Sequence, residues 1–394
     1  MRRVGRSREG NSGRRLVFVF NSLSIGGSQT VFLGLVRGAV EAGFDVIVAS
    51  RGGPMAPSFT AAGARLFTLV TRQGSAASTS SPLVSAAKTA ISMLGLIQLA
   101  RLCRGGNAVL HASQPWPVAI AAQASRLTGA PLIWHAHGTT GVEMPPAWLP
   151  TVRRASAAWV GITPEVRDAL LALAPAPHTS VLVVPNPLPV LLANNAQPAP
   201  QPTGPWIPSV PRVVVVISTL TPNKRAYVEA CIAAIRLCAS ARFPLELRIV
   251  GDGPAATALK QSARAAVADR AGLEVTFFGA SIDPWRHLSG CDVVVGMGLV
   301  ALEAAARGYK VVCASSEGVG GHFTVASYAL LNGTNFTGRG IQPLSINGLA
   351  TLIQAALVGA LDPELADFVR SAHGTAAIWQ WVSLWNCLLN ARDD

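Results

Sequence analysis

The stretch CDVVVGMGLVALEAAARG, residues 291–308, reads as one strand, one turn and one helix in succession. The β-branched run VVV is typical of a buried strand, and the Leu- and Ala-rich segment that follows favours a helix. Two glycines around Met297 predict the tight turn between them. Glu303 stands out, because a carboxylate in an apolar helix is destabilising unless something pairs with it. The residues leave three interpretations: a solvated face, an internal salt bridge or a ligand site.

The same alternation of apolar strand and helix continues on both sides of this stretch. Strands are expected at LVFVF, DVIVAS, AVLHAS, PLIWHAHG, AWVGIT and SVLVVPN, and then at RVVVVIS, LELRIVGDG, VTFFGA, DVVVGM and KVVCAS. Strands that are apolar throughout and alternate with helices predict the α/β class, with parallel sheets covered by helices on both faces. Ligands of such sheets bind at the carboxyl ends of the strands, which here predicts a cleft between two Rossmann-like domains.

A proline-rich segment divides the chain into these two domains. ANNAQPAPQPTGPWIPSVP, residues 193–211, contains six prolines and shows no helical or strand period. The predicted organisation is a disordered basic leader (1–15), an N-terminal Rossmann-like domain (16–192), the linker (193–211), a C-terminal Rossmann-like domain (212–374) and a C-terminal helix that packs back on the N-terminal domain (375–394).

Composition excludes several classes of protein. Neither half carries G-x-G-x-x-G after its first strand, which argues against a dinucleotide-dependent oxidoreductase. The six cysteines form no C-x-x-C pair, so we expect neither a zinc site nor a disulfide framework, and no essential metal or cofactor. The cysteines sit mostly in apolar segments, as reduced core thiols of a cytoplasmic protein would. No stretch reads as a membrane span of about 20 apolar residues.

The net charge of +12 lies almost entirely in the first half of the chain. Residues 1–190 hold 17 Lys and Arg against 6 Asp and Glu, and the remainder hold 15 against 14. Anionic membrane, anionic substrate and nucleic acid are the candidate partners of such a surface. Nucleic acid is not expected, because the cations are scattered and not interleaved with aromatic residues. The basic amphipathic segment 83–103, with Lys88, Arg101 and Arg104 at or beside it, predicts either reversible contact with the inner face of the cell membrane or a core helix.

Eight motifs occur in a fixed order: NSLSIGGSQTVFLGLVRGAVEAGFDVIV, WHAHG, VGITPEVRDAL, VVPNP, STLTPNKRA, IVGDGP, FFGAS and GMGLVALEAAARG. Together, over residues 16–325, they resemble the retaining GT-B-fold glycosyltransferases of the family 4, or group 1, type. The resemblance implies two facing Rossmann-like domains. It also implies a hexosyltransferase that moves a sugar from a nucleotide-diphosphate donor to a glycan or lipid-linked acceptor in cell-envelope or exopolysaccharide synthesis.

In the first half, the resemblance assigns roles to the loop IGGS and to one histidine. The loop would face the donor phosphates through Gly26 and Gly27 and the acceptor through Ser28 and Gln29, or it is an ordinary tight turn. His137 would contact the donor sugar near the reacting carbon, or it is a satisfied, partly buried histidine. His111 and His135 are weaker candidates that could point into the core, and Asn186 would shape the inter-domain turn.

In the second half, the resemblance assigns the donor to a lysine and to the helix of Glu303. Lys224 would reach the diphosphate, with Arg225 compensating for an arginine that the family carries where Thr219 stands here. Glu303 would accept hydrogen bonds from both ribose hydroxyls. The other expected donor-binding residues are Gly251, Gly298, Leu299 and Val300, with Gly251 equally consistent with a simple turn.

One departure marks a divergent subgroup. The family has a second glutamate, which grips the donor sugar, eight positions before the first, and Val295 stands there in this chain. EGVGGHFT and NFTGRG also belong to this subgroup pattern. The missing glutamate leaves open the donor sugar and two alternative functions: a sugar-nucleotide epimerase or hydrolase, and a non-catalytic protein that binds membrane or nucleic acid.

Overall fold

The computed structural model describes residues 13–70, 93–105, 107–188 and 210–391, which form two compact units. The first unit comprises Met1–Ser24, Ser28–Pro187 and Ala376–Asp394, and the second comprises Ile25–Gly27 and Leu188–Thr375. Most of the predicted leader (1–12) and of the predicted linker (193–209) lies outside the described residues.

The first unit is built on a seven-stranded sheet whose order is β3-β2-β1-β4-β5-β6-β7 and whose neighbours are all parallel. Its strands are β1 (Arg15–Val19), β2 (Asp45–Ser50), β3 (Arg65–Thr68), β4 (Ala108–Ala112), β5 (Leu132–Ala136), β6 (Ser156–Gly161) and β7 (Ser180–Val183). The central strands β4 and β5 are buried at every position, as continuous apolar runs in a doubly covered sheet should be.

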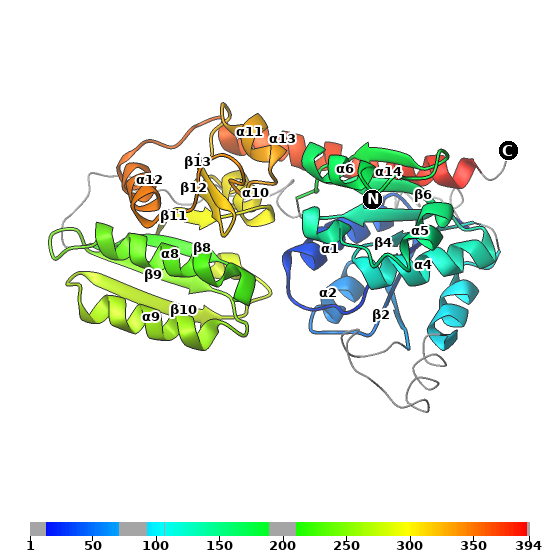
Figure 1. Ribbon diagram of the computed structural model, residues 1–394, viewed down its shortest axis with the longest axis horizontal. Helices are drawn as coiled ribbons and strands as arrows, with labels where there is room; N and C mark the ends of the chain where they lie inside the picture. Colours follow the sequence, from blue (N-terminus) through cyan, green and yellow to red (C-terminus); the bar gives the residue numbers. More distant parts are fainter. Residues whose placement is uncertain (1–12, 71–92, 106, 189–209, 392–394) are drawn as a thin grey trace, which may run out of the picture. The chain divides into compact units, whose positions relative to one another are not determined.

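Helices connect these strands (Figure 1). They are α1 (Gly27–Glu41), α2 (Ala56–Ala61), α4 (Pro115–Thr128), the 3₁₀ turn η1 (Thr139–Val142), α5 (Leu149–Ala155) and α6 (Pro164–Leu171), and a further helix covers residues 93–102. Local signals set their ends: Thr163 caps α6 by accepting a hydrogen bond from the Val166 N–H, and Gly129 closes α4 in the left-handed conformation.

A helix from the far end of the chain completes the first unit. α14 (Thr375–Asn390) buries Trp381 and Trp385 completely. It packs against α1 at Gly38, where an added Cβ would lie 2.5 Å from Cγ2 of Ile378. The close approach of the two helices therefore depends on the absence of a side chain at Gly38.

The second unit is built on a six-stranded sheet of order β10-β9-β8-β11-β12-β13. Its strands are β8 (Arg212–Ile217), β9 (Leu245–Val250), β10 (Leu273–Gly279), β11 (Cys291–Gly296), β12 (Lys310–Ser315) and β13 (Gly318–His322). Five strands are parallel, and β13 pairs with β12 in the antiparallel sense. Strands β3 and β13 were not predicted, because these two of the four edge strands carry no long apolar run.

Helices also cover the second sheet. They are α8 (Pro222–Cys238), α9 (Ala256–Ala268), the 3₁₀ turn η2 (Pro284–His287), α10 (Leu299–Ala306), α11 (Tyr328–Gly333), α12 (Ile346–Val358) and α13 (Leu365–His373). Pro222 stands at the first position of α8, where its missing N–H costs no hydrogen bond.

The strand order places the ligand-binding edge of the second unit. From β8 the chain proceeds through β9 to β10 on one side, and β11 and β12 extend the sheet on the other. The direction reverses between β8 and β11, and open α/β sheets bind ligands at such a switch point, beside the carboxyl ends of the strands. The segments that follow β8 and β11 lead into α8 and α10, which carry Lys224 and Glu303.

Candidate functional site

The helix α10 begins at a glycine with positive φ. Gly298 is the N-cap, with φ 55° and ψ −130°, a conformation that a residue with a side chain rarely adopts. The predicted turn and helix start are thus where the sequence placed them. Leu299 and Val300 form the first turn of the helix and are partly buried. Backbone N–H groups at a helix start attract anions, which suits a diphosphate.

Glu303 lies in the second turn of α10 and is 5% exposed. Burial raises the pKa of its carboxyl group to about 7, while the nearby Arg307 guanidinium and a hydrogen bond with Trp285 act in the opposite direction. The Arg307 guanidinium carbon lies 4.5 Å from the centre of the Trp285 ring. Glu303 therefore already has partners within the protein. The salt-bridge interpretation and the ribose interpretation both concern this one carboxylate.

Lys224 occupies the first turn of α8, and not a loop. Its Nζ donates a hydrogen bond to Oγ1 of Thr219 at 3.1 Å, so the residue that replaces the family's arginine also positions the lysine. Burial lowers the Lys224 pKa. The neighbouring Arg225 is exposed and pairs with Glu229 one turn along the helix at 2.8 Å.

Gly251 has a structural reason to be glycine. An added Cβ would lie 1.8 Å from the Ser218 carbonyl oxygen, and at Gly253 it would lie 2.5 Å from that of Leu220. The end of β9 is therefore packed backbone to backbone against the segment between β8 and α8. This close contact agrees with the interpretation of Gly251 as part of a simple turn. Contact between Gly251 and the nucleotide stays a prediction.

The loop IGGS, residues 25–28, opens α1 as predicted. Gly27 is the first residue of the helix, and an added Cβ there would meet no atom within 4 Å. Ser28 is partly buried, while Gln29 is buried and its Nε2 donates to the Ser22 carbonyl oxygen at 3.3 Å. The Gln29 amide therefore fastens the loop to the end of β1, and its acceptor-side role stays a prediction.

His137 follows the carboxyl end of β5 and belongs to a group of three histidines. Its ring centre lies 4.0 Å from that of His135, and its side chain hydrogen-bonds with Asn186. Nε2 of His111 lies 3.2 Å from Nδ1 of His135, and the Trp381 ring stacks on His111 at 4.9 Å between centres. The two histidines that were weaker candidates thus lie in the core, and they form one cluster with His137.

The C-terminal helix fixes the tautomers in this cluster. The Trp385 indole N–H donates to Nδ1 of His111 at 3.3 Å. An indole nitrogen can only donate, so His111 must accept at Nδ1 and, when neutral, carry its proton on Nε2. That N–H then donates to Nδ1 of His135, which places the His135 proton on Nε2.

All three imidazoles favour the neutral form. Burial lowers the pKa of His137 to about 4, although its bond with Asn186 acts in the opposite direction. The pKa values of His111 and His135 lie well below the ordinary value because both rings are buried and close to other histidines. A charge on any one of them would oppose a charge on its neighbours.

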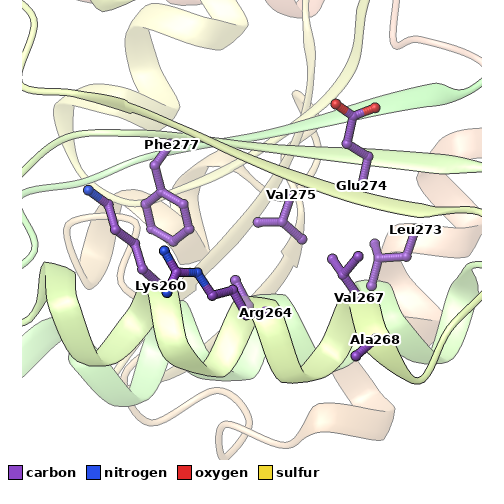
Figure 2. Close-up of a pocket in the computed structure, with 9 residues that line it drawn as sticks. Lys260, Arg264, Val267, Ala268, Leu273, Glu274, Val275 and Phe277 are labelled. Carbon is purple, nitrogen blue, oxygen red and sulfur yellow. The ribbon is translucent and has the colours of Figure 1, made fainter.

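An open groove of about 630 Å³ lies elsewhere, between α9 and the edge strand β10 (Figure 2). Lys260 and Arg264 extend along it, with the Lys260 ammonium 5.8 Å from the centre of the Phe277 ring. None of the predicted site residues lines this groove. It lies at the β10 edge of the sheet, away from the switch point.

Neither a metal-binding cluster nor a membrane-spanning helix is found among the described residues. Over these residues no group of three or more His, Cys, Asp or Glu side chains is arranged to hold a metal ion. Within the same part of the chain, no helix combines the length and the hydropathy that crossing a membrane requires.

The sequence analysis did not anticipate the partners of the site residues. Trp285 and Arg307 beside Glu303, and Trp381 and Trp385 beside the histidines, carry no local motif. The Trp385–His111 contact joins residues 274 positions apart. Only the position of Arg307, four residues after Glu303, offered a signal, because such residues lie on the same helix face.

Comparison with known proteins gives a consistent result. Residues 25–190 match the family described as Glycosyltransferase Family 4, and residues 211–328 match Glycosyl transferases group 1. No curated protein matches the sequence.

Solved structures of glycosyltransferases share the fold. HepE of Anabaena, in complex with UDP and glucose, has a TM-score of 0.67 at 16% identity, covering 94% of this chain and 98% of that one. A glycosyltransferase from Rickettsia africae has a TM-score of 0.66 at 13% identity, covering 95% and 99%. The lipopolysaccharide outer core galactosyltransferase WaaB has a TM-score of 0.61 at 12% identity, covering 96% and 99%. At these identities the likeness shows the fold, two α/β domains of the GT-B type.

Proposed function

We propose that this chain, which matches Glycosyltransferase Family 4 over residues 25–190 and Glycosyl transferases group 1 over residues 211–328, transfers a sugar from a UDP-sugar to a glycan or lipid-linked acceptor of the cell envelope, with retention of configuration. The choice of UDP is supported by the HepE structures, which contain UDP, UDP-glucose, or UDP with glucose. GDP and ADP are the alternatives.

One observation supports the proposed donor site. At the switch point of the second sheet, α10 begins at the capping residue Gly298, and the buried carboxylate of Glu303 lies one turn further along the helix. The helix start at Gly298 suits a diphosphate, and Glu303 on the next turn suits the two ribose hydroxyls of the nucleotide. Ionised Glu303 is the form that accepts both hydrogen bonds. The ribose would thus either displace Arg307 and Trp285 from the Glu303 carboxylate or bind that carboxylate together with them.

The proposed mechanism needs no nucleophile from the protein. The bond to the diphosphate loosens, positive charge develops on the sugar, and negative charge develops on the leaving phosphate. Lys224 in the first turn of α8, with its ammonium held by Thr219, would stabilise that phosphate together with the start of α10. The leaving phosphate would take the proton of the acceptor hydroxyl. Since cationic and backbone groups supply the stabilisation, we propose that no metal is essential.

The first unit offers a surface for a membrane-bound acceptor. On the helix over 93–102, Met93, Leu94 and Ile97 expose 54, 46 and 44% of their area, while Leu99 is buried. Arg101 and Arg104 are exposed beside them. Apolar side chains flanked by cations suit the headgroup region of an anionic membrane. We therefore place the protein at the cytoplasmic face of the membrane, in reversible contact with it.

Product analysis tests the proposed function. The protein is incubated with UDP-, GDP- and ADP-sugars, with and without membrane lipid extract, and the products are separated and examined by NMR. We expect acceptor-dependent release of UDP and a product with the anomeric configuration of the donor. Free sugar released without an acceptor would indicate a hydrolase, and an interconverted sugar nucleotide would indicate an epimerase. Inversion of the anomeric centre would contradict the retaining mechanism.

A further inference from the structure

The departure at Val295 raises the question of what holds the donor sugar. Val295 lies fully buried in β11, and its carbonyl oxygen accepts a hydrogen bond from the Tyr227 hydroxyl at 2.9 Å. The end of β11 therefore presents no carboxylate where the family carries one. Two motifs of the chain, EGVGGHFT (317–324) and NFTGRG (335–340), have no function so far.

The two motifs form one structural piece. An added Cβ on Gly318 would lie 2.4 Å from the Gly338 carbonyl oxygen, and one on Gly338 would lie 2.4 Å from the Gly320 nitrogen. The Val319 N–H donates to the Gln342 carbonyl oxygen at 2.8 Å. Close backbone packing thus explains why Gly318 and Gly338 are glycines. This packing fixes the turn after β12, residues 315–318, against the segment 334–342.

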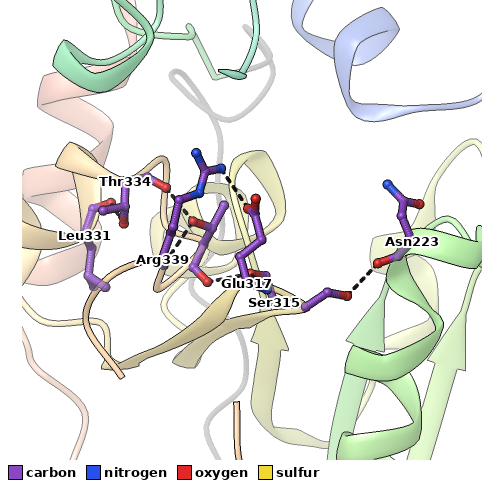
Figure 3. A network of polar contacts seen from close by, with 8 residues as sticks. Asn223, Ser315, Glu317, Leu331, Thr334 and Arg339 are labelled. Carbon is purple, nitrogen blue, oxygen red and sulfur yellow. Dashed lines mark hydrogen bonds and ion pairs between the residues drawn. The ribbon is translucent and has the colours of Figure 1, made fainter. Parts of the chain in front are cut away.

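Figure 3 shows a polar network along this piece, which reaches Asn223 at the start of α8. At the α10 end, the Asn335 side chain lies 3.8 Å from where a Cβ on Gly298 would be. At the α8 end, the Ser316 hydroxyl donates to the Asn223 carbonyl oxygen at 2.7 Å, one residue before Lys224. Between them, a nitrogen of the Arg339 guanidinium bonds to Oε2 of Glu317 at 2.8 Å.

The surroundings hold Glu317 in a defined position. Its backbone N–H donates to the Ser315 hydroxyl at 3.0 Å, and that hydroxyl donates to the Thr337 carbonyl oxygen at 2.7 Å. Its side chain is 44% exposed although Arg339 holds it. A carboxylate that is both oriented and accessible is the group that sugar hydroxyls bind, by charge-assisted hydrogen bonds.

We propose that Glu317, oriented by Arg339, binds hydroxyl groups of the donor sugar and so takes over the task of the glutamate that Val295 replaces. The proposal rests on the proposed function, since it concerns the sugar of the same donor. It assigns Glu317 to sugar specificity and not to the nucleotide, whose ribose is assigned to Glu303. Arg339 is a positioning residue, because it acts through Glu317.

Calorimetric titration of UDP, UDP-glucose and UDP-galactose into the full chain separates these roles. The variants are Glu317→Gln and Arg339→Gln, with Glu274→Gln as the matched control, an exposed carboxylate on β10. In Glu317→Gln we expect affinity for the preferred UDP-sugar to fall about tenfold or more, as for a lost charge-assisted bond, with UDP affinity unchanged. Arg339→Gln should show the same pattern more weakly, and the control should match the wild type.

Each other outcome overturns a distinct statement. Equal losses of UDP and UDP-sugar affinity in Glu317→Gln would mean that the pair supports the fold and not the sugar. Unchanged affinity for both ligands, or a wild type that gains nothing from the sugar, would remove Glu317 from the donor site. If the wild type binds the UDP-sugars and Glu317→Gln binds them with the same affinity, the role of Glu317 is wrong and the proposed function is unaffected. A wild type that binds neither UDP nor a UDP-sugar contradicts the proposed donor as well.

Discussion

At the scale of single residues, the account depends on two charged side chains whose surroundings change their chemistry. Glu303 is a carboxylate that burial drives toward the neutral form, with a pKa of about 7 against an ordinary 4.5. Lys224 is an ammonium that burial makes more acidic and that Thr219 orients. Both residues could be picked out from the sequence by motif. Their burial could not be predicted, because it depends on chain segments far away in sequence.

Glu303 predicts a definite dependence of stability on pH. Its folded-state pKa lies above its unfolded value, so its contribution to stability is fully present below about 4.5 and is lost as pH rises through about 7. Within that window the free energy of unfolding should fall by up to roughly 1.4 kcal/mol per pH unit from this group alone. Urea unfolding of the wild type and Glu303→Gln between pH 5 and 8 measures the difference. Parallel pH profiles would show that Glu303 does not titrate in this range.

Lys224 predicts a loss in turnover that exceeds the loss in donor binding. Charge on the leaving phosphate grows toward the transition state, so an ammonium beside it contributes most there. We expect Lys224→Met to lower kcat by about 100-fold or more, the scale of one lost electrostatic group, and to change donor affinity much less. Lys260→Met, in the groove beside Phe277, is the control. Equal losses in kcat and affinity would reduce Lys224 to uniform donor binding.

At the scale of secondary-structure elements, strands with apolar runs and helices with marked starts could be predicted from the sequence. β11 and α10 could be predicted because VVV is typical of a buried strand, the two glycines predict a turn, and LVALEAAARG favours a helix. β13 could not be predicted from the sequence, because GVGGH has little strand propensity. Its pairing with β12 depends on close packing of its glycines against Gly338. β3 has four residues, three of them exposed, and so lacks a burial signal.

The histidine cluster joins three elements, β4, β5 and α14, and predicts the tautomers of its members. We expect NMR of ¹⁵N-histidine-labelled protein to show His111 and His135 neutral with the proton on Nε2. Trp385→Phe removes the indole donor and should change the His111 ring signals. Trp379→Phe on the exposed face of the same helix should not. Protonation of either ring at Nδ1 in the wild type would contradict the hydrogen-bond chain.

At the scale of the whole molecule, two α/β domains with parallel sheets follow from the alternation of strands and helices. The comparisons confirm this fold class and match the two domains to two glycosyltransferase families. The uneven charge also belongs to this scale. The first half of the chain carries an excess of 11 positive charges, counted as 17 against 6, and the second half carries an excess of 1, counted as 15 against 14. The sequence pattern and the charge distribution predict neither the acceptor nor the donor sugar, because the identity of each depends on a few side-chain contacts and not on the fold.

Charge and exposed apolar residues together predict reversible membrane binding. Each cation near an anionic surface contributes about 1 kcal/mol, which salt screens. The protein should sediment with phosphatidylglycerol vesicles at low salt and be released as salt rises. Changing Lys88, Arg101 and Arg104 to glutamine should weaken binding, although Lys88 lies outside the described residues. Absence of binding at low salt would reject the idea, and binding that ignores the three changes would place the contact elsewhere.

The proposed donor site requires the second unit to bind the nucleotide of a sugar donor at the start of α10, with Glu303 in the second turn of that helix contacting the ribose. Calorimetric titration of UDP into the wild type and into Glu303→Ala tests it most directly, with circular dichroism to show that the variant is folded. We predict that UDP binds the wild type and that the variant binds more weakly by about 1–3 kcal/mol, the range for lost hydrogen bonds to a charged group. Equal UDP affinity in the wild type and a folded Glu303→Ala variant would contradict the assignment.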